Sequence, residues 1–466
     1  MDINKLVDNA ELNKELSRLR QHIQKPDCGI SDVIDGEGNQ YVDLVMEGGG
    51  MLGLALVGYT WALEQMGIRF LGIGGTSAGA INALLLSALD EPAKAKSPLL
   101  LDMLANKNFY DFVDGNKDAK DLIELALGKK ASFKIVRMIW QILKVRKHVC
   151  THYGLNKGDA FLNWLQKLLA DSGINTLYDL DLRLSTPPKG LRLRNGTLFT
   201  DADRPGGRLV IVATDVTTET RVEFPEMAKL YWADPQSVSP ALLARASMSI
   251  PMFFEPLRVD NIPQGEKAEK NWNDLAGYAK EEDPTEVIPE TAMFVDGGVV
   301  SNFPIDAFHN TACVPRRPTF GVKLEYDQRC KLHQQLPPYS DGKTVALLPM
   351  LGAVFNSARH TLDYEFVKKN PDYKNLVAFI PCTYKDASGK TLSYNWIDFN
   401  MPDSDKEALF NQGACKAIEF IKGFSEPFGG HPTKWEYYKA LRGSLIAQPQ
   451  KQPQEVLSKQ AQPAKK

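Results

Sequence analysis

Apolar residues in this chain gather in short continuous runs, and glycines mark where several of these runs end. The runs at 42–46 and 70–74 have the length of strands and contain few polar positions, which is typical of strands buried on both faces. The run at 78–86 follows the second of them after a tight turn and predicts a buried helix. Strands that alternate with helices in this way predict an α/β fold.

The same pattern divides the rest of the chain. Leu12, Leu16 and Leu19 have helical spacing near the start, and a strand at 319–324 and an apolar helix around 414–421 are predicted near the end. The last twenty residues are rich in Gln, Pro and Lys and have almost nothing to bury. We therefore expect four parts: a helical N-terminal extension (1–40), the main α/β core (41–310), the C-terminal part of the α/β unit (311–430) and a disordered tail (447–466).

A serine stands at one junction of strand and helix, in the sequence Gly75-Thr76-Ser77-Ala78-Gly79. A strand, a sharp turn and a helix around a serine form the context of a nucleophile elbow. The flanking glycines, Gly75 and Gly79, remove the side chains that would block the turn. The following helix directs its N-terminal dipole and free amides toward the Ser77 hydroxyl. Ser77 is therefore a candidate nucleophile.

A second glycine cluster, from Gly48 to Gly53, follows the strand at 42–46 and opens another helix. It has the form G-x-G-x-x-G, which is also the dinucleotide-binding fingerprint. That interpretation requires an acidic residue about 20 positions further on, at the end of the next strand. The next strand ends in Gly74-Gly75-Thr76-Ser77 instead. This favours the other interpretation, in which the glycines expose backbone N–H groups that stabilise an oxyanion.

A carboxylate that could serve the serine comes much later, in Asp296-Gly297-Gly298. An exposed aspartate has a pKa of about 3.9 and would be a poor base near neutral pH. Partial burial beside Ser77 would raise that pKa toward a useful value. Ser77 and Asp296 thus form a candidate catalytic dyad.

These blocks, together with Ala246-Ser247-Met248-Ser249-Ile250-Pro251, resemble the patatin-like phospholipase family when taken in order. The resemblance implies a three-layer α/β/α fold with a central mixed sheet, with the family core at 41–310. It implies Ser77 as nucleophile and Asp296 as proton acceptor. Backbone amides of the glycine block would form the oxyanion hole, and further glycines would shape the motifs. The oxyanion residues are Gly48, Gly49, Gly50 and Met51; the motif glycines are Gly53, Gly75, Gly79, Gly297 and Gly298.

The chain departs from the resemblance at Leu52, where many family members carry Arg or Lys. The animal triacylglycerol-lipase branch also has leucine there, so the change does not indicate a dead enzyme. It removes a cation, and the oxyanion hole must then depend on amides, including that of Ala78. The implied reaction is hydrolysis of fatty-acyl esters of phospholipids or other acyl lipids, with no metal and no cofactor.

Two other functions stay open at this point. His309 and His360 both follow Asp296, so chain order alone allows the Ser, Asp, His triad of an α/β-hydrolase. The early position of Ser77, after only the second recognisable strand, counts against it. A catalytically silent lipid-binding scaffold of the same fold is the other alternative.

Composition limits the partners. The 466 residues carry a net charge of −2, which gives no reason to expect nucleic acid, and the six cysteines form no C-x-x-C pair. Neither a signal peptide nor an apolar run of membrane-spanning length is present, so we expect a cytoplasmic or peripheral membrane location, with secretion as an effector left open. The basic, tryptophan-containing segment from Lys129 to Lys147 suits an anionic membrane surface or a cap helix. The sequence leaves the oligomeric state, the head group and the acyl length open.

Overall fold

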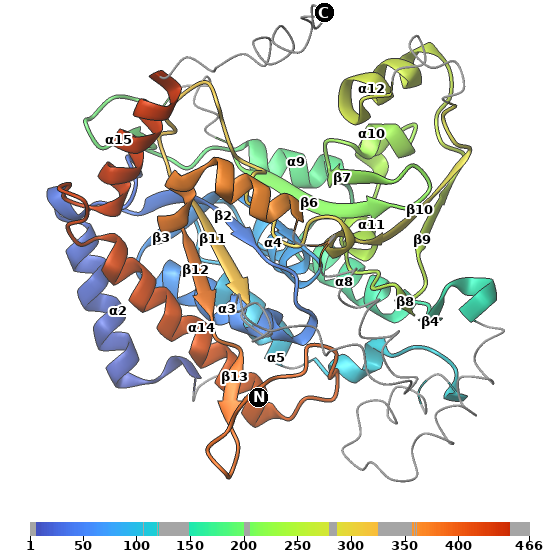
Figure 1. Ribbon diagram of the computed structural model, residues 1–466, viewed down its shortest axis with the longest axis horizontal. Helices are drawn as coiled ribbons and strands as arrows, with labels where there is room; N and C mark the ends of the chain where they lie inside the picture. Colours follow the sequence, from blue (N-terminus) through green and yellow to red (C-terminus); the bar gives the residue numbers. More distant parts are fainter. Residues whose placement is uncertain are drawn as a thin grey trace, which may run out of the picture.

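The computed structural model describes residues 6–447, apart from 106, 119, 121–148, 200–205, 279–286, 325–356, 358 and 360. Within these residues, ten strands form one mixed sheet through the centre of the molecule (Figure 1). The main path of the sheet runs β12 (Val377–Ile380), β11 (Thr319–Leu324), β2 (Gln40–Met46), β3 (Ile68–Thr76), β6 (Arg208–Asp215), β10 (Thr291–Asp296) and β9 (Leu257–Asp260). Three further strands pair beside this path: β1 (Val33–Ile34), β5 (Arg192–Leu193) and β7 (Thr220–Phe224).

The direction of the strands changes at β10 and again at β9, which points the same way as β6. Neighbouring strands from β12 to β6 are parallel, whereas β10 is antiparallel to both β6 and β9. Every residue of β2 and β3 is buried, as expected for central parallel strands covered on both faces. The predictions of strands at 42–46, 70–74 and 319–324 are confirmed.

Helices lie on both faces of the sheet (Figure 1), which confirms the predicted three-layer α/β/α arrangement. Helices α3 (Gly53–Gln65) and α4 (Ala78–Ala88) follow β2 and β3 directly, and α14 (Asp403–Phe424) lies along α3. A helical stretch at 361–369 crosses the other face. The remaining described helices are α2 (Ala10–Ile23), α5 (Ser97–Ala105), α8 (Asp159–Asp171), α9 (Leu177–Ser185), α10 (Ala228–Tyr231), α11 (Pro240–Ser247), α12 (Glu266–Ala276) and α15 (Lys434–Ala447).

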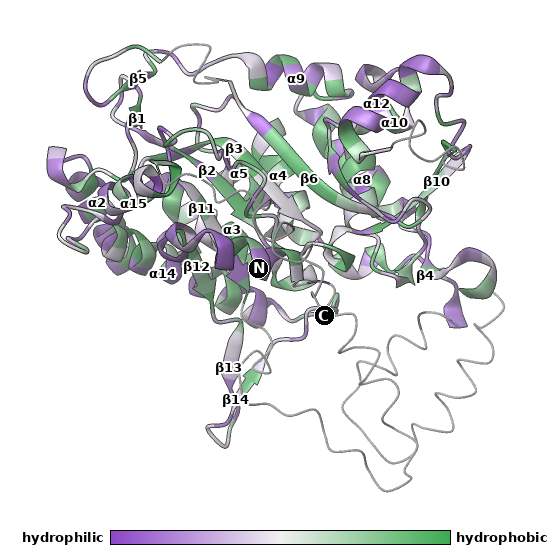
Figure 2. Ribbon diagram, turned by 45° about the horizontal axis from the view of Figure 1, so that its top comes forward, coloured by the Kyte–Doolittle hydropathy of each residue, from purple (hydrophilic) through white to green (hydrophobic). Residues whose placement is uncertain are grey.

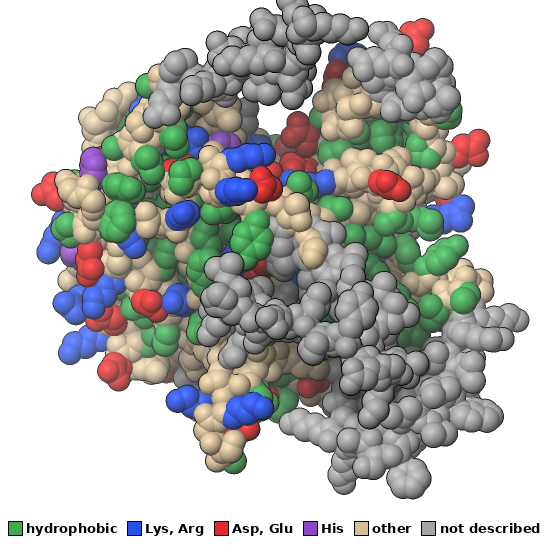
Figure 3. Space-filling model, in the orientation of Figure 1, with side chains coloured by type: hydrophobic (Ala, Val, Ile, Leu, Met, Phe, Trp, Pro, Cys, Tyr) green, Lys and Arg blue, Asp and Glu red, His purple; other side chains and the backbone are tan. Residues whose placement is uncertain are grey.

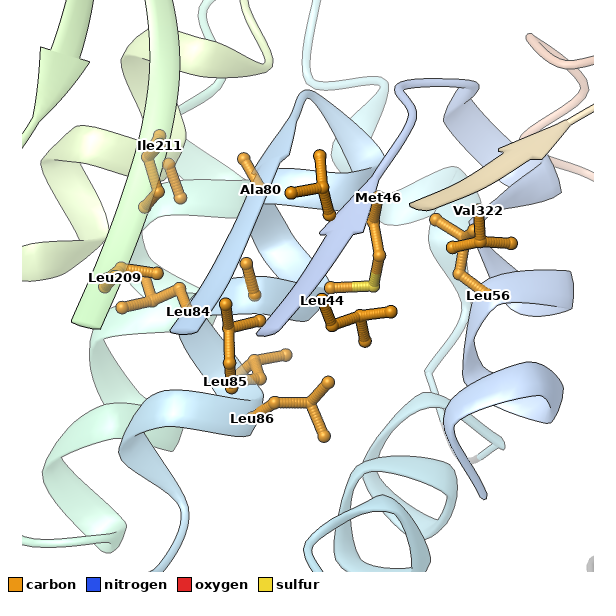
Figure 4. Packing of buried hydrophobic residues seen from close by; sticks show 14 of the residues in the cluster. Leu44, Met46, Leu56, Ala80, Leu84, Leu85, Leu86, Leu209, Ile211 and Val322 are labelled. Carbon is orange, nitrogen blue, oxygen red and sulfur yellow. The ribbon is translucent and has the colours of Figure 1, made fainter. Parts of the chain in front are cut away.

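The core is built from the apolar runs that the sequence shows. Leu84 and Leu85 of α4 pack beneath the strands that carry Leu44, Leu209 and Ile211 (Figure 4). Most of β6 is hydrophobic beyond its hydrophilic start, whereas α12 is largely hydrophilic (Figure 2). Burial of this kind contributes about 25 cal/mol per Å² of apolar surface, so the α4 face is a main source of stability.

The outer parts of the chain differ in how well they follow the sequence. Helix α2 buries Leu16 and Leu19 against the core, as their spacing predicts. The polar stretch at 261–290 contains α12, whose Trp272 is buried against Tyr231 with ring centroids 5.5 Å apart. The basic segment Lys129–Lys147 and the tail from 448 onward lie outside the described residues. Among the helices that are described, none has the length and apolar character needed to cross a membrane.

Candidate active site

Ser77 occupies the turn between β3 and α4, with φ 53° and ψ −119°. Residues other than glycine rarely adopt positive φ, and such strained positions gather at functional sites. The turn is possible because backbone packs on backbone around it: a side chain at Gly75 would meet the Gly79 carbonyl carbon at 2.5 Å, and one at Gly79 would overlap the Met46 carbonyl. The serine is 6% exposed and lies at the N-terminal end of α4.

Asp296 ends β10 and hydrogen-bonds the Ser77 side chain. The sheet register explains how residues so far apart in the sequence meet. Thr76 pairs with Val212 of β6, and Asp296 pairs with the next residue of that strand, Ala213. Asp296 therefore lies level with Ser77, one strand beyond β6.

The Asp296 carboxylate also accepts a hydrogen bond from the Gly298 N–H at 2.7 Å. Burial raises the pKa of Asp296 above its ordinary value. The hydrogen bonds from Ser77 and Gly298 and the charge of Arg359 act in the opposite direction. The carboxylate is thus a stronger base than an exposed aspartate.

Arg359 was not identified from the sequence. It belongs to no motif, and the residue is 9% exposed. Leu52, where many family members carry a cation, is fully buried in the core instead. A positive charge does act on the site, but it comes from a distant part of the chain.

The glycine block passes directly beside Ser77. A Cβ added at Gly48 would lie 3.0 Å from the Ser77 Cβ and 2.6 Å from the Asn302 Oδ1. Gly50 adopts φ 53° and lies against the Trp396 carbonyl so closely that no side chain fits there. Gly53 packs on Ala78, since a Cβ added there would lie 3.0 Å from the Ala78 Cβ. The block therefore needs glycines for space and for backbone conformation.

Two of the amides assigned to the oxyanion hole from the sequence are already used. The Gly48 N–H donates to the Asn302 carbonyl at 3.0 Å, and the Met51 N–H donates to the Trp396 carbonyl at 2.9 Å. Among the described residues, the N–H groups of Gly49 and Gly50 have no acceptor. Of the predicted residues, Gly49 and Gly50 therefore stay candidates for the oxyanion hole, together with the Ala78 N–H at the start of α4.

The third sequence block supports the elbow from behind. The Ser247 hydroxyl, at the end of α11, accepts a hydrogen bond from the Ser77 N–H at 2.9 Å and donates to the Val212 carbonyl at 2.6 Å. Two residues later, the Ser249 carbonyl accepts the Asp296 N–H at 2.8 Å. This block thus fixes the backbone of both Ser77 and Asp296, a role that its sequence alone did not reveal.

The loop after Asp296 is a further part of the site. Of this loop, the motifs include only Gly297 and Gly298. Gly297 and Gly298 lie in the short 3-10 helix η6 (Gly297–Val299). A side chain at Gly297 would overlap the Val212 carbonyl, so this glycine lets the loop turn back over β6. Asn302 then reaches the glycine block, where its Nδ2 donates to the Gly48 carbonyl at 3.1 Å.

His309, one of the two histidines of the alternative triad, does not join Ser77 to Asp296. His309 shares a hydrogen bond of 2.9 Å with the Tyr373 hydroxyl and packs edge-on against Phe366. Burial lowers its pKa below the ordinary value. His360 lies outside the described residues.

Ser77 forms part of the wall of an apolar pocket of about 80 Å³. Ser77 and Asn82 are the polar side chains of its lining. The other described lining residues are glycine, apolar or aromatic, the aromatic ones including Trp164. An apolar pocket with a few polar groups is the usual form of a site for a largely hydrophobic ligand. The apolar lining residues include Leu54, Ile81, Leu104, Phe109, Phe112, Phe161, Trp164, Met248, Ile250, Phe254 and Phe399.

A model of the family described as "Patatin-like phospholipase" matches residues 44–309. The match spans more than half of the chain and contains the elbow, the glycine block and Asp296. The chain belongs to the patatin-like phospholipase family. Membership of this family implies a lipid hydrolase.

Individual relatives are more distant. The "Uncharacterized protein YqhO" of Bacillus subtilis (strain 168) is 26% identical over 382 residues, which cover 82% of this chain and 98% of that protein. VipD from Legionella pneumophila is 14% identical with a TM-score of 0.37, covering 84% of this chain and 70% of that one. Human GIVD cytosolic phospholipase A2 in complex with methyl gamma-linolenyl fluorophosphonate is 12% identical with a TM-score of 0.34. The match covers 93% of this chain and 65% of that one. The family match carries the assignment.

Proposed function

We propose that this protein hydrolyses fatty-acyl esters of phospholipids or other acyl lipids, with Ser77 as the nucleophile and Asp296 as the proton acceptor. The observation that carries the proposal is the hydrogen bond between these side chains at the wall of an apolar pocket. A serine needs a neighbouring base to become a nucleophile, and Asp296 is the base that reaches it.

The reaction proceeds in two halves. Ser77 Oγ attacks the ester carbonyl carbon while Asp296 takes the hydroxyl proton, and a tetrahedral intermediate with a negative oxygen forms. The intermediate collapses, the bond to the alcohol breaks, and the alcohol leaves with the proton from Asp296. Water then attacks the acyl-serine, giving its proton to Asp296, and the fatty acid is released as that proton returns to Ser77.

The negative oxygen is stabilised by the N–H groups of Gly49 and Gly50 together with that of Ala78. These groups are held by the fold before the substrate arrives, so they need no rearrangement as charge develops. Loss of one such donor in other hydrolases costs about 10²- to 10³-fold in kcat. The apolar pocket holds the acyl chain beside Ser77 and keeps bulk water away from the ester.

The two alternatives predict different results. A silent scaffold requires that the nucleophile be unreactive, although the groups that activate it are present. A Ser, Asp, His triad requires an imidazole between Ser77 and Asp296, whereas these two side chains hydrogen-bond directly and His309 is bonded to Tyr373. The direct hydrogen bond favours the dyad.

Turnover of a p-nitrophenyl ester and labelling by a fluorophosphonate probe test the proposal. Ser77→Ala should lose both, because it removes the nucleophile and leaves only a small void. The loss should approach the roughly 10⁶-fold seen when other serine hydrolases lose theirs. Asp296→Asn keeps the size of the side chain but removes the base, so turnover should fall by about 10³-fold or more.

His309→Ala is the matched control and should leave turnover within about threefold of the wild type if the proposal is correct. A collapse of turnover in this variant, or in His360→Ala, would support the triad instead. Activity of Ser77→Ala within tenfold of the wild type would refute the assigned nucleophile. Absence of both labelling and turnover in the wild type would support the scaffold.

A further inference from the structure

A buried cluster of charges lies behind the glycine block. Glu47, the residue before Gly48, is 2% exposed, and its Oε1 lies 3.3 Å from the Lys323 Nζ at the end of β11. Its Oε2 accepts the Leu324 N–H at 2.7 Å. Asp363, in the helical stretch at 361–369, is 6% exposed and interacts electrostatically with both Glu47 and Lys323. Charges are rarely buried so deeply without a structural or functional reason.

Asp363 holds the loop that follows Asp296. One carboxylate oxygen accepts the Ser301 hydroxyl at 2.8 Å, and the other accepts the Phe303 N–H at 3.0 Å. These two donors stand on either side of Asn302 in the sequence. Hydrogen bonds to a charged group are among the stronger ones in proteins, so Asp363 fixes the backbone on both sides of Asn302.

Asn302 connects this loop to the glycine block through two hydrogen bonds. Its backbone carbonyl accepts the Gly48 N–H at 3.0 Å, and its Nδ2 donates to the Gly48 carbonyl at 3.1 Å. The same loop reaches the elbow, since the Thr76 hydroxyl donates to the Ser301 carbonyl at 3.0 Å. A continuous set of hydrogen bonds therefore joins Asp363 to the segments that carry Gly49, Gly50 and Ser77.

We propose that Asp363 is a positioning residue for the reaction, whose ionised carboxylate holds Ser301 and Phe303 so that the oxyanion amides stay aligned with Ser77. This inference rests on the proposed function. It assigns to Asp363 no contact with the substrate, because both hydrogen bonds of its carboxylate are to the loop at 301–303. Displacement of catalytic groups by about 1 Å can cost roughly 10²-fold in rate, which sets the size of the expected effect.

Protonation of this carboxylate should weaken the alignment near neutral pH. Burial, together with the charge of Glu47, raises the pKa of Asp363 to about 7. Lys323 and the hydrogen bonds from Ser301 and Phe303 lower it, and the guanidinium of Arg221 also faces the cluster. A protonated carboxyl carries a hydrogen on one oxygen and no longer accepts two strong hydrogen bonds, so turnover should decline as the pH falls through about 7.

Asp363→Asn tests the proposal, because an amide has the same shape as a carboxyl group but accepts hydrogen bonds through only one atom. We expect kcat for a short-chain soluble ester at pH 8 to fall by about 10- to 100-fold, with KM within about twofold of the wild type. In Asp363→Asn, the decline of turnover centred near pH 7 should disappear from the pH profile. Asp363→Glu keeps the charge and should recover part of this decline. Asp274→Asn, on the exposed surface of α12, is the matched control and should behave as the wild type.

Unchanged kcat in Asp363→Asn, or a change confined to KM, would overturn the proposal. If this variant does not fold, Ser301→Ala decides the matter, since it removes only one of the two donors and should lower kcat about threefold to tenfold. A folded Ser301→Ala protein with wild-type kcat and pH profile would then be the contrary result. If the wild type neither turns over ester nor labels with fluorophosphonate, the proposed function has failed; an active wild type with unaltered variants rejects only the role of Asp363.

Discussion

Ser77 combines two properties that rarely occur in one residue, a strained backbone and near-complete burial. A non-glycine residue at φ 53° costs on the order of 1–3 kcal/mol, so the surrounding structure must hold it in place. The hydrogen bond from its N–H to the Ser247 hydroxyl and the close packing at Gly79 provide this constraint. The strain follows from directing the hydroxyl out of the turn toward Asp296.

The closeness of the glycine block to Ser77 gives a prediction at the same scale. Gly48→Ala adds a Cβ that would lie 2.6 Å from the Asn302 Oδ1 and 3.0 Å from the Ser77 Cβ, so the loop must move. We expect about 1–3 kcal/mol loss in the free energy of unfolding and at least tenfold lower kcat. Urea denaturation and ester turnover measure the two effects.

Gly36→Ala is the control for that experiment, because nothing lies within 4 Å of its added Cβ. It should change neither stability nor turnover appreciably. If Gly48→Ala behaved like this control, the glycine block would accommodate a Cβ without moving, and its closeness to Ser77 would not matter for catalysis.

At the scale of elements, helices α3 and α14 touch backbone to backbone. A Cβ at Gly58 of α3 would overlap the Phe410 carbonyl, and one at Gly413 of α14 would overlap the Ala55 carbonyl. The two helices can approach so closely only because these positions lack side chains. Since α3 begins at Gly53, directly after the glycine block, this packing also fixes the position of that block.

We therefore predict that Gly413→Ala destabilises the protein by about 1–3 kcal/mol or more, because the added methyl group forces the helices apart. Gly423→Ala, near the end of the same helix, meets only the Lys434 Nζ at 3.8 Å and should be neutral or stabilise by up to about 1 kcal/mol. Chemical denaturation of the two variants measures the difference. Equal stability would show that α14 can shift away from α3 at little cost.

At the scale of the whole molecule, buried carboxyl groups should make stability fall as the pH rises. Burial raises the pKa of Asp363 from 3.8 to about 7, so the folded protein keeps a proton that the unfolded chain has already lost over this range. The unfolded state binds fewer protons there, and the free energy of unfolding must decrease from about pH 4 to pH 7 and then level off for this group. The effect is on the order of a few kcal/mol.

Asp363→Asn should lack this component. We expect the difference in unfolding free energy between the variant and the wild type to shift in favour of the variant between pH 5 and pH 8, measured in urea at each pH. A difference that is independent of pH would mean that the Asp363 carboxyl titrates at its ordinary value. A variant that is more stable yet slower at pH 8 would separate positioning from a purely structural role.

Contact with membranes is also a property of the whole molecule. Lys and Arg side chains lie interspersed with Asp and Glu on the left half of the face shown in Figure 3, so that part of the surface has no single sign of charge. The basic segment Lys129–Lys147 remains a proposed membrane contact. Replacing Lys144, Arg146 and Lys147 with Gln should weaken binding to anionic vesicles by about 1 kcal/mol per charge.

The salt dependence of that binding provides the check. Co-sedimentation with vesicles should weaken with added salt for the wild type, because the Debye length is about 8 Å at physiological ionic strength. Turnover of a short-chain soluble ester should stay unchanged in the triple variant. Unaltered vesicle binding together with reduced turnover would instead indicate that the segment is a cap over the site.

The central strands, the helix after Ser77 and the family can be predicted from the sequence, because these depend on local patterns: continuous apolar runs, glycines at turns and short motifs in order. The motifs also indicate Ser77 and Asp296 as the candidate nucleophile and proton acceptor. The sequence could not determine that the Met51 and Gly48 amides are already engaged, because their acceptors, Trp396 and Asn302, lie hundreds of residues away in the chain.

How these parts come together depends on contacts between residues that are far apart in the chain. The antiparallel pairing of β10 with β6 places Asp296 level with Ser77, and no local pattern encodes that register. Arg359 and Asp363 stand in no motif and act on the site through charge and through hydrogen bonds to one loop. A motif reflects interactions between residues that are close in the sequence. The electrostatics of the site and the alignment of its groups depend on residues that are close in space, and only the folded sheet brings these together.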